Sequence, residues 1–526
     1  MVLVNLMSDL IGYSRLQQLY GIELCQPLPM ICSIGPSRKS IDSGDVISEF
    51  YQSHYRPEDT LAGHLTFALK REPLNLEFLS RLFEVIDPNE LAAWFKSEPT
   101  GQYARRACFL YEWLTDVLID ASGVTQGNYV SVLNEEDYLT ATSPEKNPRW
   151  RINDNLPGNK YFCPLVRKTA GVESIEYYDI AFAIDELGAE FGQEILLKSA
   201  VWLTIKESKS SFAIEHEQKK ADRIRRFAIV MEEQCGKLDN PLSPLTLASL
   251  QKEILGANSL SYGIRQSPVM VSESRGYNNI IHYLAPHWDD IANMLEGLQA
   301  FELKTRGQSP LLRSAVISFG FVYIHPMSDG NGRISRFLIN DCLRRDKALP
   351  HPYILPVSAV MQDVSFRPYN YDQALEIFSK PLMNSIRGKI NLGREVIGAD
   401  GIPYNVHYTD YEKTNSTWRY IDLTKHAEYM GRVIKKTIES EMRTEAKILV
   451  SYAKTRLEIK QILEGPDSII DRIIRSIHQS NGVISNKLKK EHPILENIEL
   501  SANLIAVIKK NMPWDKVAGA DIDLDA

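Results

Sequence analysis

The chain has 526 residues, which suggests three or four domains by length alone. Hydrophobic residues make up 44% and charged residues 24%, as in ordinary globular proteins. The net charge of −7 excludes a general attraction to nucleic acid or acidic membranes. No apolar run approaches the roughly 18 residues that a membrane span needs. Asp9 comes early and no basic segment precedes an apolar core, so we expect neither a signal peptide nor membrane attachment.

The cysteines are scattered, and no two form a Cys-x-x-Cys pair. This spacing favours reduced, structural thiols over disulfides or a zinc site. We therefore expect a cytoplasmic protein. The six cysteines are Cys25, Cys32, Cys108, Cys163, Cys235 and Cys342.

The first 175 residues are predicted to form a helical N-terminal domain. Gly, Pro and Ser cluster at 34–44, which predicts a loop, and from Asp45 the apolar spacing becomes helical. Residues 143–160 are rich in Pro, Asn and Gly and predict an irregular loop. This part contains no catalytic set of residues.

Two helices and a β-hairpin are predicted next. Helical spacing covers Ile180–Lys198 and Ala200–Lys220. A short strand is expected at Val269–Val271, a turn at Ser272–Gly276, and a second extended run at Tyr277–Tyr283. The hairpin near 269–283 could be an ordinary surface feature.

The stretch from His325 to Arg336 carries most of the chemistry. An apolar segment, Leu311–Ile324, precedes it, and apolar residues at helical spacing follow it, so we expect a loop between two buried helices. His325 can move a proton near neutral pH. Asp329 is a hard oxygen ligand that suits Mg²⁺ shared with phosphates.

The second half of this stretch suits an anion. Gly330, Asn331 and Gly332 allow backbone N–H groups to face one way, at the start of the next helix. Arg333 and Arg336 lie three apart, on one helix face, where both can reach phosphate oxygens. The combination indicates transfer from a nucleoside triphosphate; a lone Asp-Gly-Asn-Gly would more often be a capped turn.

The C-terminal part is predicted to be a linker followed by helices. Residues 396–417 contain Gly, Asp, Pro and Asn and predict a linker, and 418–526 form a helical region. An isoleucine-rich amphipathic helix ends near Asn481-Gly482, and the basic trio Lys487, Lys489 and Lys490 follows. This order is compatible with a winged-helix module, which could bind DNA, mediate dimerisation or select targets.

The stretch from His325 resembles the motif of the Fic family, His-x-Phe-x-Asp/Glu-Gly-Asn-Gly-Arg-x-x-Arg. Every chemical position matches, and Met327 stands where the family usually has Phe. The resemblance implies a Fic-type helical catalytic domain, here 176–395, and an adenylyltransferase, because the phosphorylating branch carries Lys in place of the second Gly. It implies ATP as co-substrate and Mg²⁺ held by Asp329. His325 would be the base.

A second segment resembles the inhibitory helix of this family, with the pattern Ser/Thr-x-x-x-Glu-Gly/Asn. Ser211 and Glu215 match it near 204–220, and His216 departs from it. Taken alone, these residues are an ordinary i,i+4 pair. The resemblance implies that Glu215 pairs with Arg336, through a bidentate contact, and keeps Arg336 from the γ-phosphate.

Three further expectations come from the resemblance. The hairpin near 269–283 would be a flap that holds the target protein as an added strand. Asn340 would lie near the adenine. The segment Tyr369-Asn370-Tyr371 would form a wall of the nucleotide pocket.

We therefore expect a mainly α-helical protein with a Fic-type core, a β-hairpin flap, a helical N-terminal domain and a C-terminal region compatible with a winged helix. The expected function is transfer of AMP from ATP to a Ser, Thr or Tyr hydroxyl of a target protein, inhibited by Glu215. Gly330, Asn331, Gly332, Arg333, Arg336 and Asn340 would bind the nucleotide. Two alternatives stay open: removal of AMP at the same site, and a DNA-binding regulator with a vestigial core. A homodimer is compatible with the sequence.

Overall fold

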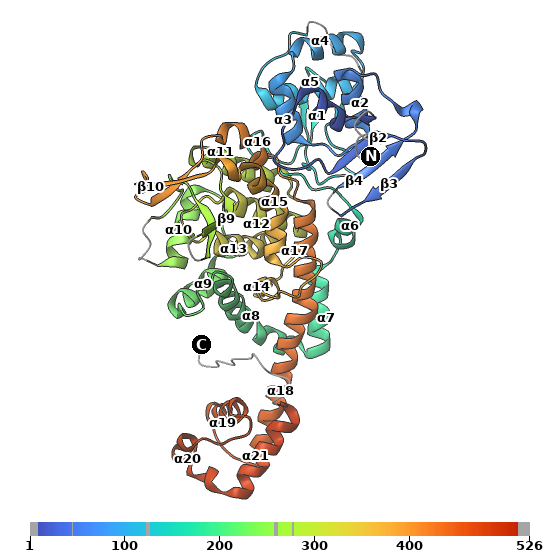
Figure 1. Ribbon diagram of the computed structural model, residues 1–526. Coiled ribbons are helices and arrows are strands. Elements are labelled where there is room, and N and C mark those ends of the chain that lie inside the picture. The colour runs from blue at the N-terminus through green and yellow to red at the C-terminus, as the bar shows by residue number, and fades with distance from the viewer. Residues whose placement is uncertain (1–8, 45, 122–126, 257–260, 276–277, 514–526) are drawn as a thin grey trace.

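The computed structural model describes residues 9–44, 46–121, 127–256, 261–275 and 278–513. It is mainly helical, with small sheets. Figure 1 shows the N-terminal part at one end, a central helical body, and a C-terminal group of helices at the other end. Each of these regions has its own buried apolar cluster.

The N-terminal part combines helices with two sheets. Its helices are α1 (Tyr13–Tyr20), α2 (Leu61–Arg71), α3 (Leu76–Val85), α4 (Pro88–Ser97) and α5 (Gln102–Thr115). The four-stranded sheet has the order β1-β2-β4-β3, from β1 (Leu10–Ile11), β2 (Met30–Ile34), β3 (Lys39–Asp42) and β4 (Ile47–Tyr51). The three-stranded sheet has the order β5-β7-β6, from β5 (Val130–Ser131), β6 (Glu145–Asn147) and β7 (Ile152–Asp154).

These sheets correct the prediction of a purely helical N-terminal domain. Strand β3 lies in the predicted loop 34–44, and β4 replaces the helical spacing expected from Asp45. Burial alternates along β4: Glu49 and Tyr51 are buried, whereas Ser48 and Phe50 are only partly buried. This two-residue period is typical of a strand. The predicted irregular loop 143–160 likewise contains β6 and β7.

The central body is built around α12 (Pro310–Ile324), whose residues are almost all buried. Helices α11 (Ile291–Lys304), α13 (Asn331–Arg345) and α17 (Thr424–Lys436) pack against it. The two predicted buried helices around the motif are therefore present. The remaining helices of this body are α6 (Ala170–Glu176), α7 (Ile180–Phe191), α8 (Gln193–Ile214), α9 (Ala221–Gln234), α10 (Pro244–Leu255), α14 (Val357–Met361) and α15 (Tyr371–Ile386).

The boundaries of two predicted helices differ from the sequence expectation. Gly192, with φ 94°, separates α7 from α8, inside the segment expected to be one helix over 180–198. A left-handed glycine interrupts a helix readily because it has no Cβ to clash. Helix α8 then ends at Ile214, six residues before the predicted end at Lys220, so the chain after Glu215 is not part of this helix.

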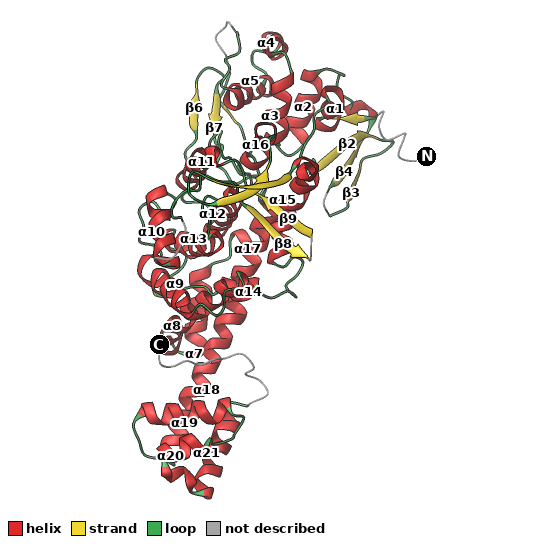
Figure 2. Ribbon diagram, turned by 60° about the vertical axis from the view of Figure 1, so that its left-hand side comes forward, coloured by secondary structure: helices red, strands yellow, loops and turns green. Residues whose placement is uncertain are grey.

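The predicted hairpin is present as antiparallel strands β8 (Met270–Arg275) and β9 (Asn278–Leu284). The strands are longer than expected, and the predicted turn at Ser272–Gly276 gives way to β8 up to Arg275; residues 276–277 lie outside the described residues. Figure 2 shows these strands in yellow beside the helices of the central body.

A second hairpin and a helix replace the predicted linker 396–417. They are β10 (Asn391–Ile397), β11 (Pro403–His407) and α16 (Tyr411–Arg419). Tyr408, Tyr411 and Trp418 are buried in the central cluster, which anchors the segment. The glycines that suggested a linker instead lie at and near the hairpin turn, where Gly401 has φ 77°.

The C-terminal region is a small group of helices. After a π-helical turn (Thr437–Met442) come α18 (Arg443–Lys460), α19 (Asp467–Gln479), α20 (Asn486–Glu491) and α21 (Ile498–Asn511). Ile470, Ile473, Ile474 and Ile477 of α19 are buried, as the amphipathic pattern predicts. Between Arg443 and residue 513 the described chain has no strand, so the winged-helix expectation lacks its wing. Residues 514–526 of the predicted helical region lie outside the described residues.

All six cysteines are free and buried. Among the residues that the structure describes, we find no helix with the length and apolar character to cross a membrane.

Candidate active site

His325 lies at the end of α12, where the helix is terminated by a left-handed residue. Its φ is 49°, and its N–H donates to the Phe321 carbonyl at 2.9 Å. Nδ1 lies 3.1 Å from the Val322 carbonyl oxygen. Because a carbonyl can only accept, Nδ1 carries the proton and Nε2 of the neutral ring is left as the acceptor. Burial, and then the nearby Arg265 guanidinium, lower the pKa of His325 to about 4.

The loop between α12 and α13 is braced from inside. The Asn331 side chain accepts from Met327 N at 3.0 Å and donates to Met327 O at 2.7 Å. Met327 is fully buried, as expected for an apolar anchor of the loop. Gln251 of α10 donates to the Asp329 carbonyl at 2.8 Å. The side chain of Asn331 is thus occupied by the loop, which leaves the backbone to face an anion.

The start of α13 has the geometry of an anion site. Gly330 is the N-cap, with φ 89°, and the first helical bond runs from Ile334 N to the Gly330 carbonyl at 3.0 Å. The N–H groups of residues 331–333 precede that bond and therefore have no carbonyl one turn back. They lie at the positive end of the helix dipole. The backbone at Gly330, Asn331 and Gly332 has the form that the predicted cradle requires, and nucleotide binding there stays a prediction.

Arg336 is held by the end of α8. Its Nε donates to Ser211 Oγ at 2.7 Å, and its Nη2 donates to Ser211 O at 3.1 Å and to Glu215 Oε1 at 2.8 Å. The expected Glu215–Arg336 pair is therefore present, but a single carboxylate oxygen makes it, and Ser211 supplies the other contacts. Burial tends to raise the pKa of Glu215, but Arg336 outweighs it and the pKa lies below its usual value.

Gly332 is where Glu215 approaches the motif. A Cβ placed on Gly332 would lie 2.0 Å from Glu215 Oε1 and 3.1 Å from Arg336 Nη1. The carboxylate thus lies directly over the start of α13, where a phosphate would have to sit. A glycine is required there for the present contact.

A second acid, Glu217, holds the other arginine of the motif. Arg333 Nη1 lies 2.5 Å from Glu217 Oε2, and Arg333 Nη2 lies 2.6 Å from Asp329 Oδ1. Glu217 also forms ion pairs with Lys220 and Arg223. The sequence reasoning missed Glu217 because it extended α8 to residue 220, which would place Glu217 on another helix face than Glu215.

The two arginines retain capacity for another ligand. Arg333 Nε and Arg336 Nη1 are buried and have no hydrogen-bond partner among the described residues. Buried guanidinium groups normally have all their donors satisfied, so an anion is the natural complement. Both side chains are almost fully buried, with 3% and 1% exposed.

Asp329 fits the metal expected from the sequence. Its side chain is 47% exposed, so an ion can reach it. No group of three or more His, Cys, Asp or Glu side chains that could hold a metal occurs in the described parts of the chain. A single carboxylate suits Mg²⁺ completed by phosphate oxygens and water, and would not suit a metal that needs an all-protein cage.

The remaining predicted residues lie farther along the fold. Asn340 is fully buried, and its amide bonds Leu355 twice, accepting from N at 2.8 Å and donating to O at 3.2 Å. Asn370 caps α15, and Tyr371 is buried beside Arg336. Asn340 therefore fixes the segment before α14 with both ends of its amide.

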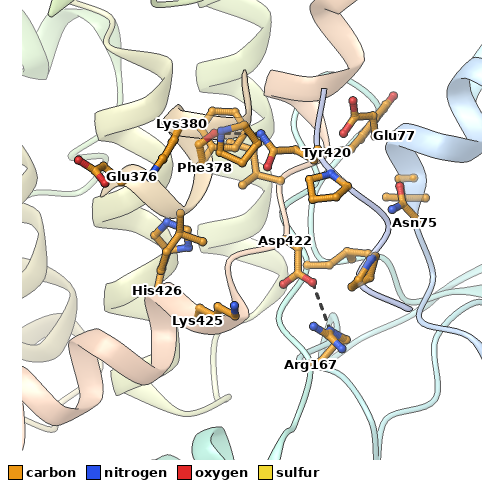
Figure 3. Close-up of a pocket in the computed structure, with 18 of the residues that line it drawn as sticks. Asn75, Glu77, Arg167, Glu376, Phe378, Lys380, Tyr420, Asp422, Lys425 and His426 are labelled. Atoms are coloured by element: carbon orange, nitrogen blue, oxygen red, sulfur yellow. Dashed lines mark hydrogen bonds and ion pairs between the residues drawn. The ribbon is translucent and has the colours of Figure 1, made fainter. Parts of the chain in front are cut away.

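A cavity of about 730 Å³ lies between the N-terminal part and the central body. Figure 3 shows Asn75 and Glu77 on one side of it, with Glu376 and His426 across from them. None of its described lining residues belongs to the stretch 325–336. The cavity is thus separate from the candidate active site.

Comparison with known proteins identifies the central segment. Residues 241–343 match the model of the Fic/DOC family, so the chain contains a Fic/DOC family domain, which runs from α10 into α13. No curated protein matches the sequence.

Two solved structures are similar. A Fic family protein from Desulfovibrio desulfuricans G20 is 18% identical, with a TM-score of 0.35, over 64% of this chain and 92% of that one. A Fic domain containing signaling protein from Bacteroides thetaiotaomicron VPI-5482 is 15% identical, with a TM-score of 0.26, over 42% and 92%. Both scores are low, so the assignment rests on the family match and the motif.

Proposed function

We propose that the chain is a protein adenylyltransferase that transfers AMP from ATP to a hydroxyl of a target protein and is inhibited by Glu215. The observation that carries the proposal is the contact of Glu215 with Arg336, made directly over the N-terminus of α13. A motif with two cationic side chains and an anion cradle, closed by a carboxylate, has the form of a phosphate site under inhibition.

The proposed reaction uses the target hydroxyl as nucleophile. Its oxygen forms a bond to the α-phosphorus while the bond from that phosphorus to the bridging oxygen breaks, and pyrophosphate leaves. His325 Nε2 accepts the hydroxyl proton. A pKa of about 4 keeps this imidazole neutral, and therefore able to accept, at physiological pH.

The phosphates are assigned to the start of α13. The N–H groups of residues 331–333 would receive phosphate oxygens, and the unpartnered nitrogens of Arg333 and Arg336 would bind the outer phosphates. Asp329 would hold Mg²⁺, which when bound screens the charge of the phosphates. The target would add an extended segment to the β8–β9 hairpin.

Inhibition follows from competition for the same donors. While Glu215 holds Nη2 of Arg336, that guanidinium cannot present both of its terminal nitrogens to the γ-phosphate, and the carboxylate repels the triphosphate. ATP would then bind in an unproductive position. Removal of the carboxylate frees both the arginine and the space over Gly332.

The test is incubation of purified variants with α-labelled ATP and Mg²⁺. We expect Glu215→Gly to label itself or an added protein at least 10-fold faster than wild type, and Glu215→Gly with His325→Ala to give no label. Glu194→Gly, at the opposite end of α8, serves as the matched control and should behave as wild type. Equal labelling by wild type and Glu215→Gly would refute the inhibitory role.

One alternative, removal of AMP from a modified target, has some support. The Glu215 carboxylate partly opposes the lowering of the pKa of His325, which indicates that the two groups are close, and its side chain is 34% exposed, so it could orient a water. A preloaded target that loses AMP with wild type but keeps it with Glu215→Gly would favour this reaction.

A further inference from the structure

Arg265 ties three separate backbone segments to one guanidinium group. Its Nε donates to the His325 carbonyl at 2.7 Å, its Nη1 to Ser267 O at 2.8 Å, and its Nη2 to Pro286 O at 2.7 Å. Ser267 precedes β8 and Pro286 follows β9. A single side chain therefore holds the motif histidine and both roots of the hairpin.

The burial of this charge needs an explanation. Arg265 is 1% exposed, and the only carboxylate among the main electrostatic influences on its guanidinium is Asp400, which acts without a direct ion pair between described residues. Burying an unpaired charge costs several kcal/mol. The charge is offset by three carbonyls, one of which belongs to the C-terminal end of α12, the negative end of its dipole.

Other contacts strengthen the same junction. Arg265 N donates to Pro326 O at 2.9 Å, and Ile264 pairs with Met327 in an antiparallel bridge. From β9, the Tyr283 hydroxyl donates to the Tyr323 carbonyl near the end of α12. The hairpin and the histidine thus form one hydrogen-bonded unit centred on Arg265.

We propose that Arg265 is a positioning residue that fixes the register between the β8–β9 hairpin and His325, so that a target strand added to the hairpin presents its hydroxyl to the imidazole. The role rests on the proposed transferase function. Arg265 touches neither substrate; it acts through His325 and through Ser267 and Pro286.

The position of Arg265 also sets the electrostatic surroundings of the ring. The charged groups that act on the imidazole are Arg265, Glu215 and Asp329. Arg265 disfavours the imidazolium, whereas the two carboxylates favour it. Replacement of Arg265 by an uncharged residue should therefore raise the pKa of His325. A loosened hairpin root alone should not change that pKa.

The experiment compares Arg265→Met, Arg265→Lys and Asp400→Ala in the Glu215→Gly protein. Asp400 is the matched control, because it accepts from Gln266 N and Ser267 Oγ, each at 2.8 Å, and so holds the same hairpin root without contacting His325. We measure kcat and the KM for a target protein. In parallel, NMR of ¹³Cε1-labelled histidine follows the imidazole without nucleotide, with His325 assigned by its loss in His325→Asn.

We expect Arg265→Met to lower kcat by about 100-fold, because a displacement of about 1 Å at a reacting centre can cost that much. The His325 imidazole of this variant should titrate at a higher pH than that of the Glu215→Gly parent. Arg265→Lys should keep the titration midpoint and still lower kcat about 10-fold, since its ammonium lacks the planar fork. Asp400→Ala should raise only the KM. If Arg265→Met does not fold, Arg265→Lys decides.

The proposal is overturned if the Arg265 variants match Asp400→Ala in kcat and in the titration of His325. Failure of the transferase function has a different signature. In that case the Glu215→Gly parent itself gives no transfer, while the NMR comparison still reports whether Arg265 controls the imidazole.

Discussion

At the residue scale, the site depends on which acids occupy the two motif arginines. Arg336 faces Ser211 and Glu215, and Arg333 faces Glu217 and Asp329. The sequence pattern led to the first pair, because the spacing of Ser211 and Glu215 is local. It could not lead to Glu217, whose contact depends on where α8 ends.

The pKa of His325 gives a prediction at this scale. Its imidazole is held near pKa 4 in the folded chain, below the ordinary 6.5, so it stays unprotonated as the pH falls through 6.5. Glu215 is one of the groups that favour the imidazolium, so loss of its charge does not raise the pKa of His325. The transfer rate of Glu215→Gly should therefore stay level from about pH 8 to about pH 5.5. Half-loss of the rate near pH 6.5 would contradict this assignment.

Release of the Glu215 contact by mild acid is not expected. The folded pKa of Glu215 lies below 4.5, so the stability it contributes is present above 4.5 and is lost only as the pH falls through the lowered value. Wild type should remain inhibited down to about pH 5. A labelling rate that rises in wild type between pH 7 and pH 5.5, but not in Glu215→Gly, would show otherwise.

Glu217 leads to a separate prediction. Because its carboxylate occupies Arg333 and lies near the phosphate cradle, Glu217→Gln in the Glu215→Gly protein should tighten ATP binding about 3- to 10-fold, as loss of one coupling of about 1 kcal/mol would. Isothermal calorimetry measures the change. Glu232→Gln, an exposed acid of α9, is the control, and equal Kd values for all three proteins would rule the role out.

At the element scale, the end of α8 explains the residue pattern at 211–217. Glu217 N donates to Phe212 O at 2.8 Å, and His216 between them has φ 57°. This is the closing motif in which the left-handed position favours Gly or Asn. The departure at His216 therefore costs conformational strain and leaves the Glu215 contact in place.

His216→Gly should stabilise the protein by up to about 1 kcal/mol and strengthen the hold on Arg336. We expect His216→Gly to have a higher melting temperature and a lower residual labelling rate than wild type. Asn481→Gly is the control, because Asn481 has φ 49° in the same arrangement at the end of α19, far along the chain from the site. A labelling rate that changes equally in both variants would speak against the link to inhibition.

The elements that the sequence predicted differ from those it did not in how local their sequence signals are. Helices α12 and α13 have long apolar patterns, and strands β8 and β9 are neighbours in sequence, so local signals sufficed. Strand β4 pairs in parallel with β2 across residues 35–46, and β10 is exposed along its whole length. A single sequence does not reveal the distant partner of β4. Strand β10 pairs with its neighbour β11, but it has no alternation of buried and exposed residues from which a strand could be predicted.

At the scale of the whole molecule, the chain places the site between segments that are distant in sequence. Residues 211–217 contact the motif arginine Arg336, and residues 264–286 contain the β8–β9 hairpin. Asp400, from the second hairpin, accepts a hydrogen bond from Gln266 N at the start of the first hairpin. The motif residues could be located from the sequence, because twelve consecutive positions contain them. The contacts of Arg265 could not be predicted from the sequence, because the three carbonyls that accept from it come together only in the folded chain.

The central claim is that His325 performs nucleotidyl transfer and Glu215 restrains it. Intact-mass spectrometry of four proteins after incubation with ATP and Mg²⁺ tests it most directly: wild type, Glu215→Gly, His325→Ala and the double variant. We expect an AMP adduct that is largest on Glu215→Gly, and no adduct on either protein without His325. An adduct on His325→Ala, or none on Glu215→Gly with a full set of candidate target proteins present, would contradict it.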